Sequence, residues 1–235
     1  NTHMERLIIE ELLQWKTSPR RKPLILNGAR QVGKTWILKH FGQTHYDNVA
    51  YINCDKESLA AKLFEDYDVK RIIQAIEAMT NTQIVAGKTL IIIDEIQEVP
   101  RGLHALKYFA ENAPEHHIAV AGSLLGLLLH QGESFPVGKV NMLQMHPMTF
   151  LEFLKAMGED KIYQQLLNRE WSVTNTMHEK IVKHLRMYLY VGGMPEAVKT
   201  FADSMDYKAV RMVHEQLLKS YHNDFSKHPP QEIVK

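Results

Sequence analysis

One eight-residue segment restricts the fold of this chain more than any other feature of its sequence. It has the pattern G-x-x-x-x-G-K-T and reads Gly28-Ala29-Arg30-Gln31-Val32-Gly33-Lys34-Thr35. A short apolar run precedes it at residues 24–26, and a helical segment is expected from Gly33 to about Phe41, ended by Gly42. Between a strand and a helix, the backbone N–H groups of such a loop cradle phosphates, and the helix adds its positive end. The sequence therefore predicts an α/β fold built around a phosphate-binding loop.

Two side chains of this loop have roles that follow from its chemistry. We expect Lys34 to reach the β and γ oxygens of a nucleotide and the Thr35 hydroxyl to coordinate Mg²⁺. The remaining loop residues and Trp36, which follows them, are expected to line the bound nucleotide. Arg30 could reach the γ-phosphate or could form an ion pair on the surface, and its position in the sequence leaves both roles open.

Strand-like and helix-like segments alternate up to about residue 146. The expected strands are residues 24–26, 49–54, 89–93, 118–121 and 140–145. Alternation of this kind predicts βαβ units, and strands without polar interruptions predict a sheet covered on both faces. After Pro147 only helical patterns remain. We expect a doubly wound, mainly parallel sheet in residues 4–146, followed by an all-helical lid region in residues 147–235.

An acidic pair follows the apolar strand at residues 90–93. We expect this strand beside the strand of the loop, where it delivers Asp94 to the Mg²⁺ ion, and Glu95 can then orient and deprotonate an attacking water. Two acids could instead cap the following helix, because carboxylates are favoured at helix N-termini. Beside a complete phosphate-binding loop we prefer the catalytic interpretation, and the second carboxylate favours hydrolysis over phosphate transfer.

Three further positions are candidates. Ser123 follows the strand at residues 118–121, where a polar residue can contact the γ-phosphate or the lytic water, although a turn serine is the alternative. Lys139 could supply positive charge in the transition state, but an exposed lysine at a strand edge is the preferred interpretation. Pro195 ends a Gly-Gly-Met-Pro segment that could press on an adenine, yet on the residues alone an ordinary turn between helices is preferred.

Composition excludes several classes of protein. Lys and Arg number 28 and Asp and Glu 27, so the net charge of +1 gives no general electrostatic argument for binding nucleic acid or a membrane. A single cysteine, Cys54, excludes a disulfide scaffold and fits a reducing cytosol. The apolar stretches are shorter than the roughly 18 residues of a spanning helix. We therefore expect a cytoplasmic protein that does not cross a membrane.

Several motifs together resemble a prokaryotic family of AAA-type ATPases. They occupy residues 26–35, 93–97, 121–123, 147–153 and 192–196. The resemblance implies an AAA-type core with a helical lid, a sensor role for Ser123, and an adenine-side position for Pro195. It also implies a further C-terminal domain of unknown function. Many relatives have Gly-Arg where this chain has Gly138-Lys139, so an arginine finger is not carried over to this position.

The function expected from the sequence is Mg²⁺-dependent binding of ATP by an ATPase that acts as a conformational switch. A nucleotide-kinase-like phosphotransferase and an ATP-binding module without turnover are the alternatives. The expected partner is an adenine nucleotide. The sequence does not identify a client, whether protein or DNA, and it leaves a homo-oligomer open.

Overall fold

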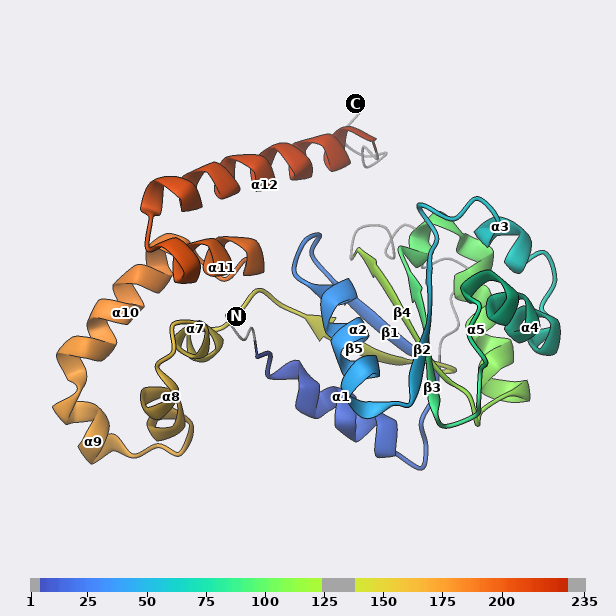
Figure 1. Cartoon of the computed structure of the whole chain (residues 1–235), viewed down its shortest axis with the longest axis horizontal. Helices are drawn as coiled ribbons and strands as arrows, with labels where there is room; N and C mark the ends of the chain where they lie inside the picture. Colours follow the sequence, from blue (N-terminus) through green and yellow to red (C-terminus); the bar gives the residue numbers. More distant parts are fainter. Residues whose placement is uncertain (1–4, 124–137, 228–235) are drawn as a thin grey trace. The chain divides into compact units, whose positions relative to one another are not determined.

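The computed structural model describes residues 5–123 and 138–227, which belong to two compact units (Figure 1). The first, called here the α/β unit, consists of Leu7–Ala29 and Gly33–His146. The second, called the helical unit, consists of Asn1–Arg6, Arg30–Val32 and Pro147–Lys235. The chain therefore passes from one unit to the other and back within the predicted phosphate-binding loop.

The α/β unit alternates strands and helices, as the sequence predicts. Its elements are α1 (Ile8–Thr17), β1 (Leu24–Gly28), α2 (Lys34–His45), β2 (Asn48–Asn53), α3 (Ala60–Leu63), α4 (Val69–Thr80), β3 (Thr89–Asp94), the 3₁₀ helix η1 (Ile96–Glu98), α5 (Pro100–Asn112), β4 (His117–Ser123) and β5 (Asn141–Met145). Among the described residues, the strands form one five-stranded sheet in the order β2-β3-β4-β1-β5. Every neighbouring pair is parallel, which confirms the predicted parallel sheet.

Both faces of this sheet are covered, because successive side chains of a strand point to opposite faces. Ile25, Ile91 and Val120 belong to one buried cluster with apolar side chains of α4 and α5. On the other face of the sheet, Leu90 of β3 lies against Gly42 of α2. Figure 1 shows the sheet between α1 and α2 on one side and α3, α4 and α5 on the other. The predicted α/β class with helices on both faces is confirmed.

The order of the strands corrects one expectation about the acidic pair. Asp94 was expected on a strand beside β1, but β4 lies between β1 and β3. The pattern of a strand predicts its burial and not its neighbour in the sheet, so the sequence did not contain this information. Because the carboxyl ends of parallel strands meet at one edge, Gly28, Asp94 and Ser123 still end their strands at the same edge.

A second expectation, that Gly42 ends the helix after the loop, is wrong. The helix α2 continues to His45, and Gly42 lies buried inside it. A Cβ atom at Gly42 would collide with the Val49 side chain and lie 3.3 Å from Leu90 Cδ2. The glycine therefore permits a close approach of α2 to strands β2 and β3, and it has a packing role instead of a terminating one.

The helical unit contains six described helices. They are α7 (Phe150–Ala156), α8 (Asp160–Leu167), α9 (Trp171–Thr176), α10 (His178–Val191), α11 (Pro195–Ser204) and α12 (Tyr207–Lys227). Phe153, Val191 and Phe201 are fully buried in its main apolar cluster. Within residues 147–227, which the structure describes, there is no strand, in agreement with the predicted helical region.

A buried ion pair lies in the helical unit at the start of α7. Arg6 and Glu152 have side chains that are only 5% and 6% exposed, and their Nε and Oε1 atoms are 2.9 Å apart. The other carboxylate oxygen of Glu152 accepts the N–H of Thr149 at 2.7 Å, which completes a capping box. Arg6 also donates from Nη1 to the carbonyl of Val32 at 3.0 Å. One guanidinium group thus contacts both α7 and the centre of the predicted phosphate-binding loop.

Candidate nucleotide-binding site

The predicted loop joins β1 to α2 at the carboxyl edge of the sheet. Gly33 precedes the first residue of α2 with a φ angle of 99°, in the left-handed region that favours glycine. The Lys34 side chain is buried, and its Nζ donates to the carbonyls of Gly28 and Ala29 at 2.9 and 2.8 Å. The amine therefore lies inside the curve of the loop, at the N-terminus of a helix, where the helix dipole also favours an anion.

The structure brings Thr35 and Asp94 together. The Thr35 hydroxyl donates to Oδ2 of Asp94 at 2.5 Å, although the two residues are far apart in the sequence. The other carboxylate oxygen, Oδ1, accepts the N–H of Glu95 at 3.0 Å. Asp94 is 2% exposed, so its carboxylate is held in one orientation inside the protein.

A third group on Asp94 was missed by the sequence analysis. The Tyr51 hydroxyl, from the edge strand β2, donates to Oδ2 of Asp94 at 3.0 Å. Burial raises the pKa of Tyr51 to about 12, and the neighbouring Asp94 carboxylate adds to the rise, so the hydroxyl keeps its proton at neutral pH. The available signal was weak: Tyr51 is a polar aromatic residue in a strand whose partner in the sheet could not be predicted.

Glu95 has an unusual backbone conformation. Its φ angle is 52°, in a region that few residues other than glycine adopt, and such outliers often occur at functional sites. Its side chain makes no capping hydrogen bond to η1, which does not support the alternative in which it caps a helix. Instead, Oε2 accepts a hydrogen bond from Nε2 of Gln97 at 2.5 Å. Sequence reasoning gave Gln97 no role.

Ser123 and Trp36 lie in the same unit. Ser123 is the last residue of β4 and pairs with Gly28 in the register of β1 and β4, so it lies beside the start of the loop. Trp36 is 47% exposed and stacks on His40 one turn later in α2, with ring centroids 4.9 Å apart. A ring that is half exposed on the first turn of α2 remains available to a ligand.

The centre of the loop contacts the helical unit, to which it belongs. The Tyr221 hydroxyl of α12 donates to the carbonyl of Arg30 at 2.7 Å, and Nε2 of Gln31 donates to the hydroxyl of Ser220 at 3.4 Å. Gln31 has a φ angle of 62°. These bonds use the backbone carbonyl of Arg30 and the side-chain amide of Gln31, and the two roles considered for the Arg30 side chain stay predictions.

Lys139 and Pro195 have structural explanations. Lys139 forms an ion pair of 3.0 Å with Glu111 of α5 and lies just before β5, at the amino edge of the sheet, away from the phosphate-binding loop. Pro195 is the first residue of α11, a position for which its fixed φ suits it. A Cβ atom at the preceding Gly193 would collide with the backbone of Met148, so this glycine allows the turn to pack closely.

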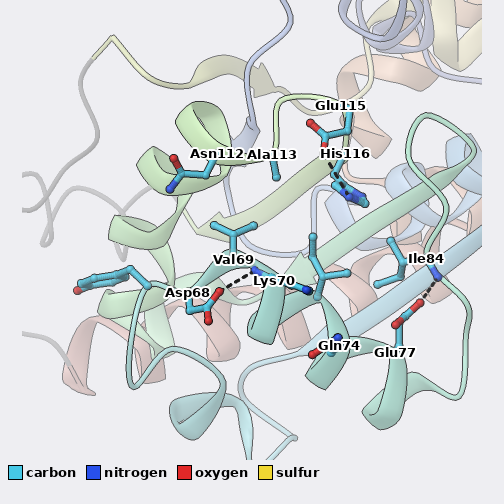
Figure 2. A pocket seen from close by; sticks show the side chains of 12 residues that line it. Asp68, Val69, Lys70, Gln74, Glu77, Ile84, Asn112, Ala113, Glu115 and His116 are labelled. Atoms are coloured by element: carbon cyan, nitrogen blue, oxygen red, sulfur yellow. Dashed lines mark hydrogen bonds and ion pairs between the residues drawn. The ribbon is translucent and has the colours of Figure 1, made fainter.

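A pocket of 470 Å³ lies elsewhere in the α/β unit (Figure 2). It is lined by side chains of α4 and by residues around His116, which comes just before β4 and thus lies at the amino edge of the sheet. Its polar groups support local structure: Asp68 caps α4, and Glu77 accepts the N–H of Ile84 at 2.8 Å. The pocket contains none of the predicted site residues, and the loop therefore remains the candidate site.

Comparison with known proteins gives one family and several solved structures. A family model described as an AAA domain matches residues 20–154. Among solved structures, the chain is similar to the Aeropyrum pernix ORC1 protein in complex with DNA (15% identity, 65% of this chain and 46% of that chain, TM-score 0.40). It is also similar to Drosophila ORC bound to DNA (13% identity, 87% of this chain and 59% of that chain, TM-score 0.48). A third similar structure is the Thermotoga maritima RuvB Holliday junction branch migration motor (11% identity, 91% of this chain and 70% of that chain, TM-score 0.46).

The chain spans 46% and 59% of the first two of these structures. Among curated proteins, none matches the chain. In the part of the chain that the structure describes, there is no helix with both the length and the apolar character needed to cross a membrane.

Proposed function

We propose that this chain, which belongs to the AAA domain family, binds ATP together with Mg²⁺ and hydrolyses the bond between its β- and γ-phosphates, which releases ADP and phosphate. The observation that carries the proposal is the arrangement of the loop and the acidic strand end. The Thr35 hydroxyl lies 2.5 Å from Asp94, and the Lys34 amine lies within the adjoining loop. These three groups come from β3 and from the start of α2, and they meet at the carboxyl edge of the sheet.

The donor groups at this point fit Mg²⁺. The ion prefers oxygen ligands and is usually held by one or two protein groups together with phosphate oxygens, and Thr35 and Asp94 offer a hydroxyl and one carboxylate. The described residues contain no cluster of three or more His, Cys, Asp or Glu side chains that would favour another metal site. Bound there, the ion would withdraw charge from the phosphate oxygens.

The remaining residues divide the chemistry among them. Lys34 binds the β- and γ-phosphate oxygens of the nucleotide, which then replace the two loop carbonyls as acceptors for its amine. Glu95 accepts a proton from the attacking water at Oε1, since Oε2 is already held by Gln97. Ser123, beside Gly28 in the sheet, binds the γ-phosphate or the water. Backbone N–H groups from Gly28 to Thr35 bind the remaining phosphate oxygens, and Trp36 lies next to them.

Several finer parts of the proposal depend on the sequence alone. We keep residues 4–146 as the ATPase core and residues 147–235 as the lid, and we keep Pro195 on the adenine side of the nucleotide, as the resemblance implies. A conformational switch, an unidentified protein or DNA client, and assembly into a homo-oligomer complete the proposal. The single thiol of Cys54, buried in the core, fits a reducing cytosol.

The test compares ATP affinity by calorimetry and phosphate release for the wild-type chain and two variants. Lys34→Ala should weaken ATP by roughly a hundredfold, since a contact between charged groups of about 3 kcal/mol is lost. Glu95→Gln should bind ATP normally but release phosphate about a hundredfold or more slowly, because the amide cannot accept the proton.

A matched control is Lys139→Ala, which removes a lysine at the opposite edge of the sheet and should change neither measurement. If Lys34→Ala retains the wild-type affinity, the assignment of the loop is wrong. Normal phosphate release by Glu95→Gln would remove Glu95 as the base. Transfer of the γ-phosphoryl group to an added nucleoside monophosphate, which yields ADP and a nucleoside diphosphate without free phosphate, would favour the phosphotransferase. Binding of ATP with neither phosphate release nor transfer would favour the module without turnover.

A further inference from the structure

Three hydrogen-bonding side chains form a line that ends on Asp94. Nδ2 of Asn53 donates to the Tyr51 hydroxyl at 3.3 Å, and the Tyr51 hydroxyl donates to Oδ2 of Asp94 at 3.0 Å. Asn53 and Tyr51 belong to β2, and β2 pairs in parallel with β3, so that Tyr51 is opposite Ile92 and Asn53 is opposite Asp94. Tyr51 therefore reaches Asp94 diagonally across the two strands, a distance that an aromatic side chain can span.

The backbone that follows β2 determines which group donates in each of these hydrogen bonds, because it orients the side-chain amide of Asn53. Oδ1 of Asn53 accepts the N–H groups of Asp55 and Lys56 at 3.0 and 3.1 Å. The amide nitrogen of Asn53 must then be the atom that faces Tyr51, where it can only donate. Because the Tyr51 oxygen accepts this bond, its proton is directed at the carboxylate of Asp94.

The Tyr51 ring also contacts α2, the helix that follows the predicted phosphate-binding loop. Nζ of Lys39, in α2, lies over the ring at 3.5 Å from its centroid. A cation at this distance from an aromatic face is attracted by the ring quadrupole. Lys39 lies a little more than one turn after Thr35, the residue whose hydroxyl shares Oδ2 of Asp94 with Tyr51. The ring thus contacts both of the elements that carry the proposed Mg²⁺ ligands.

From this geometry we infer that Tyr51 is a positioning residue for the Mg²⁺ site, since it fixes the Asp94 carboxylate in the orientation that the ion requires. The inference rests on the proposed function, because it assumes that Asp94 and Thr35 hold the ion. Two hydroxyl donors on Oδ2 and the Glu95 N–H on Oδ1 prevent the carboxylate from rotating. Removal of the Tyr51 hydroxyl takes away one of these three restraints and leaves both proposed ligands in place.

The experiment uses Tyr51→Phe, which keeps the ring under Lys39 and removes only the hydroxyl. ATP affinity is measured by calorimetry over a range of Mg²⁺ concentrations and in excess EDTA, with no dependence on turnover. The Mg²⁺ concentration that gives half of the maximal gain in ATP affinity should rise about tenfold, as is typical for the loss of a group that orients a metal ligand. The affinity in EDTA should not change.

Tyr108→Phe is the matched control. Tyr108 belongs to the same unit but stacks on Tyr67, with ring centroids 4.7 Å apart, and contacts neither proposed ligand in any described interaction. It should leave the Mg²⁺ dependence as in the wild-type chain. A second variant, Asn53→Ala, leaves the Tyr51 hydroxyl in place without its directing donor and should give a smaller shift of about threefold, part of the Tyr51→Phe effect.

The outcomes separate the inference from the proposed function. An unchanged Mg²⁺ dependence in Tyr51→Phe overturns the inference. An equal loss of affinity with Mg²⁺ and in EDTA also overturns it, because a purely structural role would produce that result. If the wild-type chain itself shows no gain in ATP affinity with Mg²⁺, the proposed function fails, and this failure is visible without any variant.

Discussion

The buried pair of Arg6 and Glu152 gives the sharpest test of how the helical unit is held together. In Glu152→Gln the size of the side chain is kept and its charge is removed. Glu152 uses one oxygen for Arg6 and the other for the N–H of Thr149, at 2.9 and 2.7 Å. A glutamine has one acceptor oxygen, so one of these two buried donors loses its acceptor in the variant.

The expected cost follows from the burial of the pair. Breaking a buried ion pair by changing one partner typically destabilises a protein by about 3–5 kcal/mol, because the other charge stays in a poorly solvated environment. At about 2–4 °C for each kcal/mol, this predicts a fall of at least about 6 °C in the melting temperature. Differential scanning calorimetry of the whole chain measures this fall, with far-UV circular dichroism to follow the helices.

An exposed ion pair in the same unit provides the control. Lys155 contacts Glu5 at 2.6 Å, but the side chain of Glu5 is 61% exposed. Glu5→Gln should therefore change stability by less than about 1 kcal/mol. The double variant Arg6→Met with Glu152→Gln should recover part of the loss, because no buried charge is left and the glutamine oxygen can still accept the N–H of Thr149. A shift of less than about 2 °C for Glu152→Gln would refute the argument that burial makes this pair sensitive.

Two further predictions concern the α/β unit. Gly42→Ala should destabilise it by about 1–3 kcal/mol in denaturant titrations, because the new methyl group meets Val49, although alanine is the better helix former. The control is Gln43→Ala, on the exposed face of the same helix. A gain in stability for Gly42→Ala would contradict the packing role. Burial, helped by Arg21 and other nearby basic groups, lowers the pKa of His117 from 6.5 to about 4. Below about pH 6.5 the unfolded chain therefore takes up a proton that the folded chain does not. The contribution of His117 to stability should be complete above about pH 6.5 and should fall by roughly 2 kcal/mol as the pH drops toward 4. His117→Asn should flatten this part of the profile, and an equal slope in both proteins would show that other groups cause it.

The sequence by itself predicted the local elements and the phosphate-binding role that we propose for the loop. The segment from Gly28 to Thr35 lies between an apolar strand and a helix and predicts a phosphate-binding turn, because the glycines and the helix N-terminus act over only a few residues. The alternation of buried strands and helices likewise predicted the parallel sheet, since burial on both faces is visible in each strand. The acidic pair Asp94 and Glu95 became a candidate for the same reason, because it directly follows such a strand.

Only the tertiary structure decided which elements lie next to one another. The position of β4 between β1 and β3, the packing of Gly42 against Val49, and the hydrogen bond from Tyr51 to Asp94 all depend on strand order. Periodicity in a strand reports how much of it is buried and on which faces, but it does not identify the neighbour that buries it. Contacts between residues distant in the sequence, which orient the proposed site, therefore become visible only when the chain is folded.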